Sequence, residues 1–185
     1  MKYTKDYRMD DYDIIMSHLS ALRGKPDCRY LEIGVFEGRS LLGRMSDLFT
    51  HPSCRAVGVD SWRCPGWKES RHQRIKGNAY ANLEGRDRIT LLEMTGLEAM
   101  IDLDLESFDL VYIDADHRSF AVFADACTAW CLVKKGGYML FDDTGEDYWR
   151  NADGDGPLRA VRRFLVCTPT ATVLHMGKQT LLRKD

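Results

Sequence analysis

The sequence lacks several features that would assign it to a special class. No cysteine pair has the Cys-x-x-Cys spacing, so a structural zinc site is not expected. No apolar run approaches the roughly 20 residues of a membrane span, and the stretch MKYTKDYRMDDYD has no apolar signal-peptide core. The formal net charge is only −2, which gives no reason to expect a nucleic acid or a membrane as partner. These absences predict a cytoplasmic protein with reduced cysteines.

Apolar strands and helical patterns alternate along the 185 residues, which suits a single domain. Strands are expected at 29–35, 55–60, 88–93, 108–114 and 138–143, and helices at 10–23, 38–49, 71–84, 97–103, 119–133 and 155–166. The stretches ATVLHM and QTLLRK flank a Gly-Lys turn and predict a closing hairpin. This pattern indicates a mostly parallel α/β sheet, covered on both faces, with an antiparallel strand at one side.

The helix expected over 119–133 has the strongest apolar pattern. Its stripe of large and small apolar residues should face the core, and consists of Phe120, Phe123, Cys127, Trp130 and Cys131. Cys127 and Cys131 are interpreted as small core residues rather than as a metal-binding pair. Gly136 and Gly137 are expected to end the helix.

Acidic residues follow the predicted strands at the edge where ligands bind in such sheets, namely Glu32, Asp60, Glu93, Asp114, Asp142 and Asp143. The first strand leads into LEIGVFEGRS, a turn that matches neither a P-loop nor a full Gly-x-Gly-x-x-Gly motif. Gly34 and Gly38 would let the backbone approach a ligand, with Ser40 following. Glu32 could pair with a cationic amine, and Asp60 could accept hydrogen bonds from ribose hydroxyls. A tight turn without a ligand is the alternative.

Five stretches occur in an order that resembles a known family: YLEIGVFEGRSLL, AVGVDSW, RITLLEMTG, FDLVYIDADH and KKGGYMLFDDT. This order resembles the class I S-adenosylmethionine-dependent methyltransferases, and most closely methyltransferase family 24, the small-molecule and sugar O-methyltransferases. It is also similar to the metal-dependent catechol and caffeoyl-CoA O-methyltransferases. The resemblance implies a Rossmann-like, doubly wound sheet of seven strands, six parallel and one antiparallel, in one domain.

The resemblance also implies roles for individual residues. Glu32, Gly34 and the following turn would hold the methionine half of the cofactor, and Asp60 the ribose. Four further residues would lie near the adenine: Ser61, Trp62, Thr95 and Gly96. The resemblance also divides residues 1–185 into an N-terminal helical segment (1–28), a cofactor-binding core (30–144) and a substrate loop, helix and hairpin (145–185).

The remaining acids suggest a cation site. Mg²⁺ prefers oxygen ligands, and Asp114, Asp142 and Asp143 would supply three carboxylates from neighbouring strand ends. The same pattern is typical of the metal-dependent branch of the family, in which Asp114 also lies at the cofactor. Another divalent cation, or a metal-free site in which these acids contact substrate or cofactor, is the alternative.

Two residues compete for the role of general base. In related sugar O-methyltransferases the base is at the position of Asp116, which is therefore the favoured base. His117, whose ordinary pKa lies near neutrality, is the rival, and would otherwise support the site or contact the substrate. Asp116 could instead accept backbone N–H groups at the start of the next helix.

These observations predict an S-adenosylmethionine-dependent O-methyltransferase that acts on a small hydroxylated molecule or sugar. Its substrate pocket is expected to be either open or completed by a second subunit in a homodimer. Two alternatives on the same fold remain, a metal-dependent hydroxylase and a non-catalytic cofactor-binding protein. A nucleic-acid methyltransferase is disfavoured.

Overall fold

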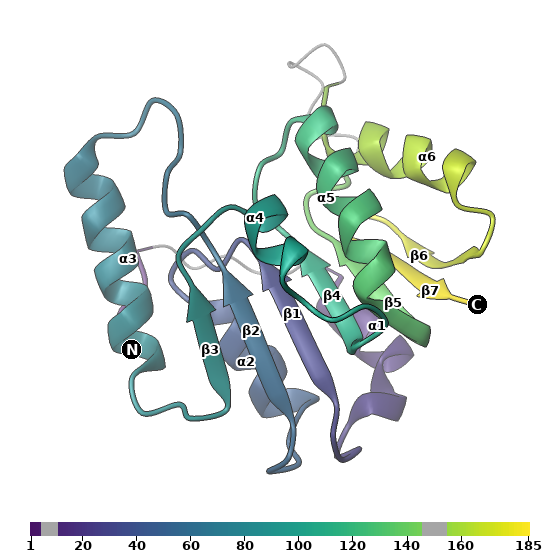
Figure 1. The fold of residues 1–185 in the computed structure, drawn as a ribbon, viewed down its shortest axis with the longest axis horizontal. Coiled ribbons are helices and arrows are strands. Elements are labelled where there is room, and N and C mark those ends of the chain that lie inside the picture. Colours follow the sequence, from purple (N-terminus) through teal and green to yellow (C-terminus); the bar gives the residue numbers. More distant parts are fainter. Residues whose placement is uncertain (5–10, 146–154) are drawn as a thin grey trace.

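The protein, represented by a computed structural model that describes residues 1–4, 11–145 and 155–185, is built around one seven-stranded sheet (Figure 1). The strands are β1 (Arg29–Ile33), β2 (Arg55–Val59), β3 (Ile89–Leu92), β4 (Phe108–Ile113), β5 (Val133–Phe141), β6 (Ala171–Met176) and β7 (Thr180–Lys184). The helices are α1 (Tyr12–His18), a 3₁₀ turn (Ser20–Leu22), α2 (Arg39–Asp47), α3 (Glu69–Leu83), α4 (Gly96–Ile101), α5 (Ser119–Leu132) and α6 (Pro157–Cys167).

The strand order is β3-β2-β1-β4-β5-β7-β6. β1 to β5 pair in parallel, β7 pairs antiparallel with β5, and β6 pairs antiparallel with β7. Six strands therefore run in one direction and β7 runs against them, which confirms the predicted Rossmann-like architecture. The carboxyl ends of β1 to β5 meet at one edge, and the turn between β6 and β7 reaches the same edge because Thr144 donates its N–H to Lys178 O at 2.8 Å.

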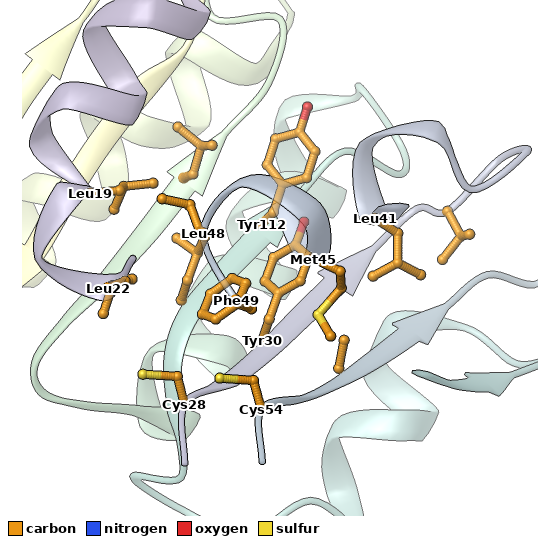
Figure 2. Close-up of a cluster of buried hydrophobic side chains, with 14 of the residues drawn as sticks. Leu19, Leu22, Cys28, Tyr30, Leu41, Met45, Leu48, Phe49, Cys54 and Tyr112 are labelled. Carbon is orange, nitrogen blue, oxygen red and sulfur yellow. The ribbon is translucent and has the colours of Figure 1, made fainter. Parts of the chain in front are cut away.

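Each face of the sheet has its own apolar core. Helices α4, α5 and α6 cover the face toward the viewer in Figure 1, while α1 and α2 lie behind it. The rear core joins Leu19, Leu41, Phe49, Tyr30 and Tyr112, all of them buried. Figure 2 shows Tyr30 and Tyr112 within this cluster, with their hydroxyls pointing the same way and away from Cys28 and Cys54. Since those cysteines precede β1 and β2, the hydroxyls point toward the carboxyl edge.

The structure corrects the prediction that Gly136 and Gly137 end the fifth helix. The helix ends at Leu132, and β5 begins at once at Val133 and runs through both glycines. The pairing with β4 shifts register between Phe108 and Leu110, and Gly136 has a φ of 77°. The glycines therefore form an irregularity near the amino end of a strand, where the left-handed conformation favours glycine.

The predicted apolar stripe of this helix is also partly wrong. Phe120 is 79% exposed, and Cys127 and Cys131 are exposed free thiols. The buried face of the helix is instead rich in small residues, which let the helix lie close to the sheet. This face includes Val122, Ala126, Ala129 and Trp130.

The remaining boundaries differ from the prediction by a few residues. The helix expected over 10–23 divides into α1 and the 3₁₀ turn, and α6 begins with Pro157 in its first turn, where proline is well tolerated. The loop expected to form part of a substrate segment falls largely on residues 146–154, outside the described residues. Within the described ranges, no helix has the length and apolar character needed to cross a membrane.

Candidate cofactor and acid site

The turn after β1 brings the ends of two strands into contact. Gly34 has a φ of 95°, and a Cβ built on it would lie 2.0 Å from the backbone oxygen of Asp114, at the end of β4. Its N–H donates to Val59 O, at the end of β2, at 2.8 Å. Gly38, with a φ of 81°, then begins α2. Both predicted glycines are therefore required by the backbone, and Gly34 leaves no room for a side chain between β1 and β4.

Glu32 lies at the floor of this turn and is fully buried. Its carboxylate accepts hydrogen bonds from the hydroxyls of Tyr30 and Ser40. Burial raises the pKa of Glu32 to about 7, although Arg44, Ser40 and Tyr30 all act in the opposite direction. Several neighbours thus stabilise the negative charge of Glu32, but burial opposes it. The carboxylate is therefore only partly ionised at neutral pH.

Asp60 binds the backbone of the turn. Its two carboxylate oxygens accept the N–H groups of Phe36, at 2.8 Å, and Trp62, at 2.6 Å. Burial raises the pKa of Asp60, and these backbone hydrogen bonds partly counter that effect. Trp62 is buried, and its indole N–H donates to Phe36 O at 2.8 Å. The structure therefore brings Asp60 and Trp62 against the turn, while the Ser61 hydroxyl accepts the N–H of Arg63 at 3.3 Å.

Thr95 and Gly96 form the start of α4. Thr95 caps the helix, accepting the N–H of Glu98 while the Glu98 side chain binds back to the N–H of Thr95. A Cβ on Gly96 would lie 2.7 Å from Ile33 Cγ2, at the end of β1. The local geometry of Thr95 and Gly96 is thus explained by helix capping and by close packing against β1.

The three acids predicted to share a cation lie together at the ends of β4 and β5. Burial raises the pKa of Asp114, and the negative charges of Asp142 and Asp143 raise it further. His117 Nε2 lies 2.9 Å from Asp143 Oδ2 and 3.7 Å from Asp114 Oδ1. Burial lowers the pKa of His117, but the hydrogen bond and charge of Asp143, together with the charges of Asp142 and Asp116, outweigh that effect, so the net shift is upward. Within the described ranges, no set of three or more His, Cys, Asp or Glu side chains is arranged to hold a metal ion.

Asp116 is oriented differently from these acids. Its carboxylate pairs with the guanidinium of Arg118 and also accepts the Arg118 N–H at 2.8 Å. The hydrogen bonds and charge of Arg118 lower the pKa of Asp116. The alternative considered for this residue, a backbone contact at the start of α5, is therefore present in the structure.

Three residues beneath the acids were not predicted from the sequence: Arg44, Tyr112 and Gln179. Gln179 Nε2 donates to Asp142 Oδ1 at 2.8 Å and to the Tyr112 hydroxyl at 3.3 Å. The Tyr112 hydroxyl in turn lies 3.4 Å from Asp114 Oδ2, and the Arg44 guanidinium stacks on the Tyr112 ring at 4.0 Å. Tyr112 and Arg44 did carry a signal, since Tyr112 precedes Asp114 by two strand positions and Arg44 follows Ser40 by one helical turn.

Comparisons with known proteins agree with this arrangement. The sequence model of methyltransferase family 24, a methyltransferase domain, matches residues 31–144. The O-methyltransferase ankF of Aspergillus thermomutatus is 28% identical over 116 residues, which cover 63% of this chain and 45% of that protein. The uncharacterized protein R132 of Acanthamoeba polyphaga mimivirus is 29% identical over 137 residues, covering 73% and 60%. The chain thus spans about half the length of the curated relatives it matches.

Solved structures share the fold over nearly the whole chain. An O-methyltransferase from Bacillus cereus in complex with SAH is 19% identical, with 98% of this chain and 84% of that chain covered and a TM-score of 0.68. TomG of Streptomyces achromogenes, an O-methyltransferase in complex with SAM, is 21% identical, with 97% and 82% covered and a TM-score of 0.68. Because the family model matches more than half of the sequence, the chain belongs to methyltransferase family 24.

Proposed function

We propose that this protein is an S-adenosylmethionine-dependent O-methyltransferase that acts on a small hydroxylated molecule or a sugar with the help of a divalent cation. One observation carries the proposal. The turn at Gly34, after β1, lies directly against the backbone of Asp114. A ligand bound at this turn would therefore lie beside the acid cluster. The SAM and SAH named for the two solved O-methyltransferases support the choice of cofactor.

The cofactor would be held by the buried carboxylates that line the turn. Glu32 would bind the amino group of the methionine half, and Asp60 the ribose hydroxyls, because each is anchored by hydrogen bonds that fix its orientation. Gly34 and Gly38 would let the ligand approach the backbone, with Ser40 fixing Glu32 from α2. Four further residues would contact the adenine: Ser61, Trp62, Thr95 and Gly96.

The oxygen donors of the acid cluster are the kind that a hard cation prefers, although the described side chains are not already arranged as a metal site. Asp114, Asp142 and Asp143 offer only carboxylate oxygens, and the mutual repulsion that raises the pKa of Asp114 is what a bound cation would relieve. Gln179 Oε1 adds a buried oxygen with no hydrogen-bond partner among the described residues. A divalent cation at these residues, Mg²⁺ or a similar ion, would lower the pKa of the acceptor hydroxyl and fix its position.

The chain offers two groups for the acceptor proton, and the contacts favour His117 over Asp116. Arg118 occupies the Asp116 carboxylate, whereas His117 faces the acids directly. His117 would accept the proton from its place beside Asp143, and alignment of the acceptor by the acids would supply much of the rate. Asp116 would then position Arg118 and the start of α5.

Calorimetry tests the cofactor step. We expect S-adenosylmethionine and S-adenosylhomocysteine to bind the wild-type protein, and Asp60→Asn to bind both at least about tenfold more weakly, by analogy with the loss of one charge-assisted hydrogen-bond pair. Asp87→Asn, at an exposed position before β3, is the matched control. Absence of binding to either ligand would refute the proposal.

Product mass tests the chemistry. Incubation with S-adenosylmethionine and a panel of catechols, hydroxylated metabolites and sugars should yield products heavier by one methylene unit, and chelation by EDTA should reduce the yield. Cofactor binding with no product from any acceptor class would favour a non-catalytic binding protein, and addition of an oxygen atom would indicate a hydroxylase.

A further inference from the structure

Arg44 lies in an unusual place for an arginine. It is on the inner face of α2, between Leu41 and Met45, and is 1% exposed. A buried guanidinium is costly unless acids and aromatic faces compensate for lost water. The position therefore needs an explanation beyond helix packing.

The surroundings of Arg44 provide that compensation. Its guanidinium lies over the Tyr112 ring at 4.0 Å, a favourable arrangement when both groups are desolvated. Its charge acts on the two tyrosines, on Glu32 and on Asp142. The acids around it come from two elements: Glu32 from β1, whose cross-strand neighbour on β4 is Tyr112, and Asp142 from the end of β5.

Two hydrogen-bonded branches leave this position toward the edge of the sheet. In the first, Tyr30 and Ser40 donate to Glu32, and Ser40 lies one helical turn before Arg44 on α2. In the second, Gln179 joins the Tyr112 hydroxyl to Asp142. In Figure 2 the Tyr112 ring lies above the Tyr30 ring, and both hydroxyls point the same way. Arg44 is thus the cation beneath both the cofactor-binding branch and the acid branch.

We propose that Arg44 is a positioning residue for the cofactor: its buried positive charge keeps the Glu32 carboxylate ionised and in place for the amino group of the methionine half. This inference rests on the proposed function and assigns a new residue to it. Arg44 touches neither the cofactor nor the acceptor in this role and acts through Glu32. The other titratable groups on which Arg44 acts are Tyr12 from α1, Tyr30 from β1, Tyr112 from β4 and Asp142 from the end of β5, and Asp114 acts on Glu32 from the end of β4.

Binding measurements against pH test the role. Arg44→Met, which keeps an unbranched apolar stem but not the charge, should bind S-adenosylhomocysteine about fivefold more weakly than wild type at pH 7 and recover toward pH 9, since raising the Glu32 pKa from about 7 by one unit lowers its ionised fraction at pH 7 from about one half to about one tenth. Arg44→Lys should retain the wild-type profile within about threefold. Arg55→Met, an identical charge change on the exposed start of β2 at the opposite edge, is the control. An Arg44→Met profile parallel to that of wild type at every pH would overturn the proposal.

A second measurement does not depend on any cofactor. Arg44→Met should lower the melting temperature less in a Glu32→Gln background than in the wild type, because the neutral amide no longer needs the cation. Equal losses in both backgrounds would show a packing role only and would contradict the proposal. If Arg44→Met does not fold alone, the same cycle decides: folding restored by Glu32→Gln supports the charge role, and no restoration opposes it.

The two proposals fail in different ways. A wild-type protein that binds neither S-adenosylmethionine nor S-adenosylhomocysteine refutes the proposed function, and the unfolding cycle still decides whether Arg44 supports Glu32. A wild-type protein that binds the cofactor, with Arg44→Met unaltered in its pH profile, refutes the role of Arg44 alone.

Discussion

β4 carries a buried or half-buried aspartate at each end, and the two have opposite surroundings. At the amino end, Asp109 accepts the N–H of Arg29 at 2.9 Å and pairs with Lys134 at 2.6 Å and Lys25 at 3.5 Å. Burial opposes ionisation there, but the lysines and the Arg29 N–H outweigh it and lower the pKa of Asp109. At the carboxyl end, burial and other acids raise the pKa of Asp114.

The difference separates a carboxylate whose counter-charges come from the chain itself from one that lies among other acids. Lysines and a backbone N–H balance the charge of Asp109. At the other edge the chain gathers Asp114, Asp142 and Asp143, with His117 Nε2 2.9 Å from Asp143. An arrangement that disfavours its own ionisation is typical of a functional site.

The largest expected effect comes from the glycine that joins β1 to β4 at the carboxyl edge. Gly34→Ala should lower the free energy of unfolding by more than about 4 kcal/mol, or prevent folding, because its Cβ would overlap the Asp114 backbone. Gly136→Ala, near the amino end of β5, has a similar positive φ of 77° but open space around it. It should cost only about 1–2 kcal/mol. Urea denaturation of both variants makes the comparison, and equal costs would contradict it.

The second effect concerns activity. Asp142→Ala should reduce methyl transfer by about 100-fold, since it removes one carboxylate of the proposed cation site, and EDTA should reduce the wild-type rate while leaving the residual rate of Asp142→Ala nearly unchanged. Asp104→Ala, an exposed acid at the amino edge, is the control. Full activity of Asp142→Ala in the presence of EDTA would remove the cation from the proposed mechanism.

The third effect concerns Asp109, at the amino edge of the sheet. Asp109→Asn should lower the free energy of unfolding by about 2 kcal/mol at pH 7, because it weakens the hydrogen bond from Arg29 and the pairs with both lysines. The folded-state pKa of Asp109 is depressed, so its stabilisation is present above the ordinary aspartate pKa and is lost as the pH falls through the lower folded value. The difference between the variant and the wild type should therefore shrink as the pH falls below the ordinary aspartate pKa. A difference that does not change with pH would indicate a loss of packing instead.

The smallest effect involves a third buried acid, on α5. Burial, followed by the charge of Asp116, raises the pKa of Asp125 to about 6, and no ion pair of Asp125 is present within the described residues. Its contribution is favourable below the ordinary aspartate pKa and is lost as the pH rises through about 6. At pH 8 the free energy of unfolding of Asp125→Asn should therefore exceed that of the wild type by about 1 kcal/mol, which raises its melting temperature. Near pH 4 the two proteins should melt at the same temperature. The opposite trend with pH would contradict this account.

The sequence predicted the features that depend on local order along the chain. Apolar runs ended by acids located the strands and the edge at which Glu32, Asp60 and Asp114 meet, and the glycine turn indicated a close backbone approach. Strand direction followed from the alternation with helices. These signals are short-range, and each is read from a single element.

The missed features depend on which elements become neighbours. The strand through Gly136 forms because it pairs with β4, so helix-ending chemistry alone misled the prediction. Phe120 has the right spacing for the core, but it lies at the exposed start of α5. Gln179 reaches Asp142 because β7 is inserted beside β5, and no local pattern indicates that position.

The insertion of β7 between β5 and β6 has a consequence for biosynthesis. During translation β5 and β6 emerge before their shared neighbour, so neither can complete its hydrogen-bonding pattern until β7 arrives. The apolar edge of β5 remains open during that interval, and Leu181 and Leu182 are the buried residues that later cover it. Gln179 arrives just before β7. A nascent chain therefore cannot complete the contact between Gln179 and Asp142 before β7 has paired with β5.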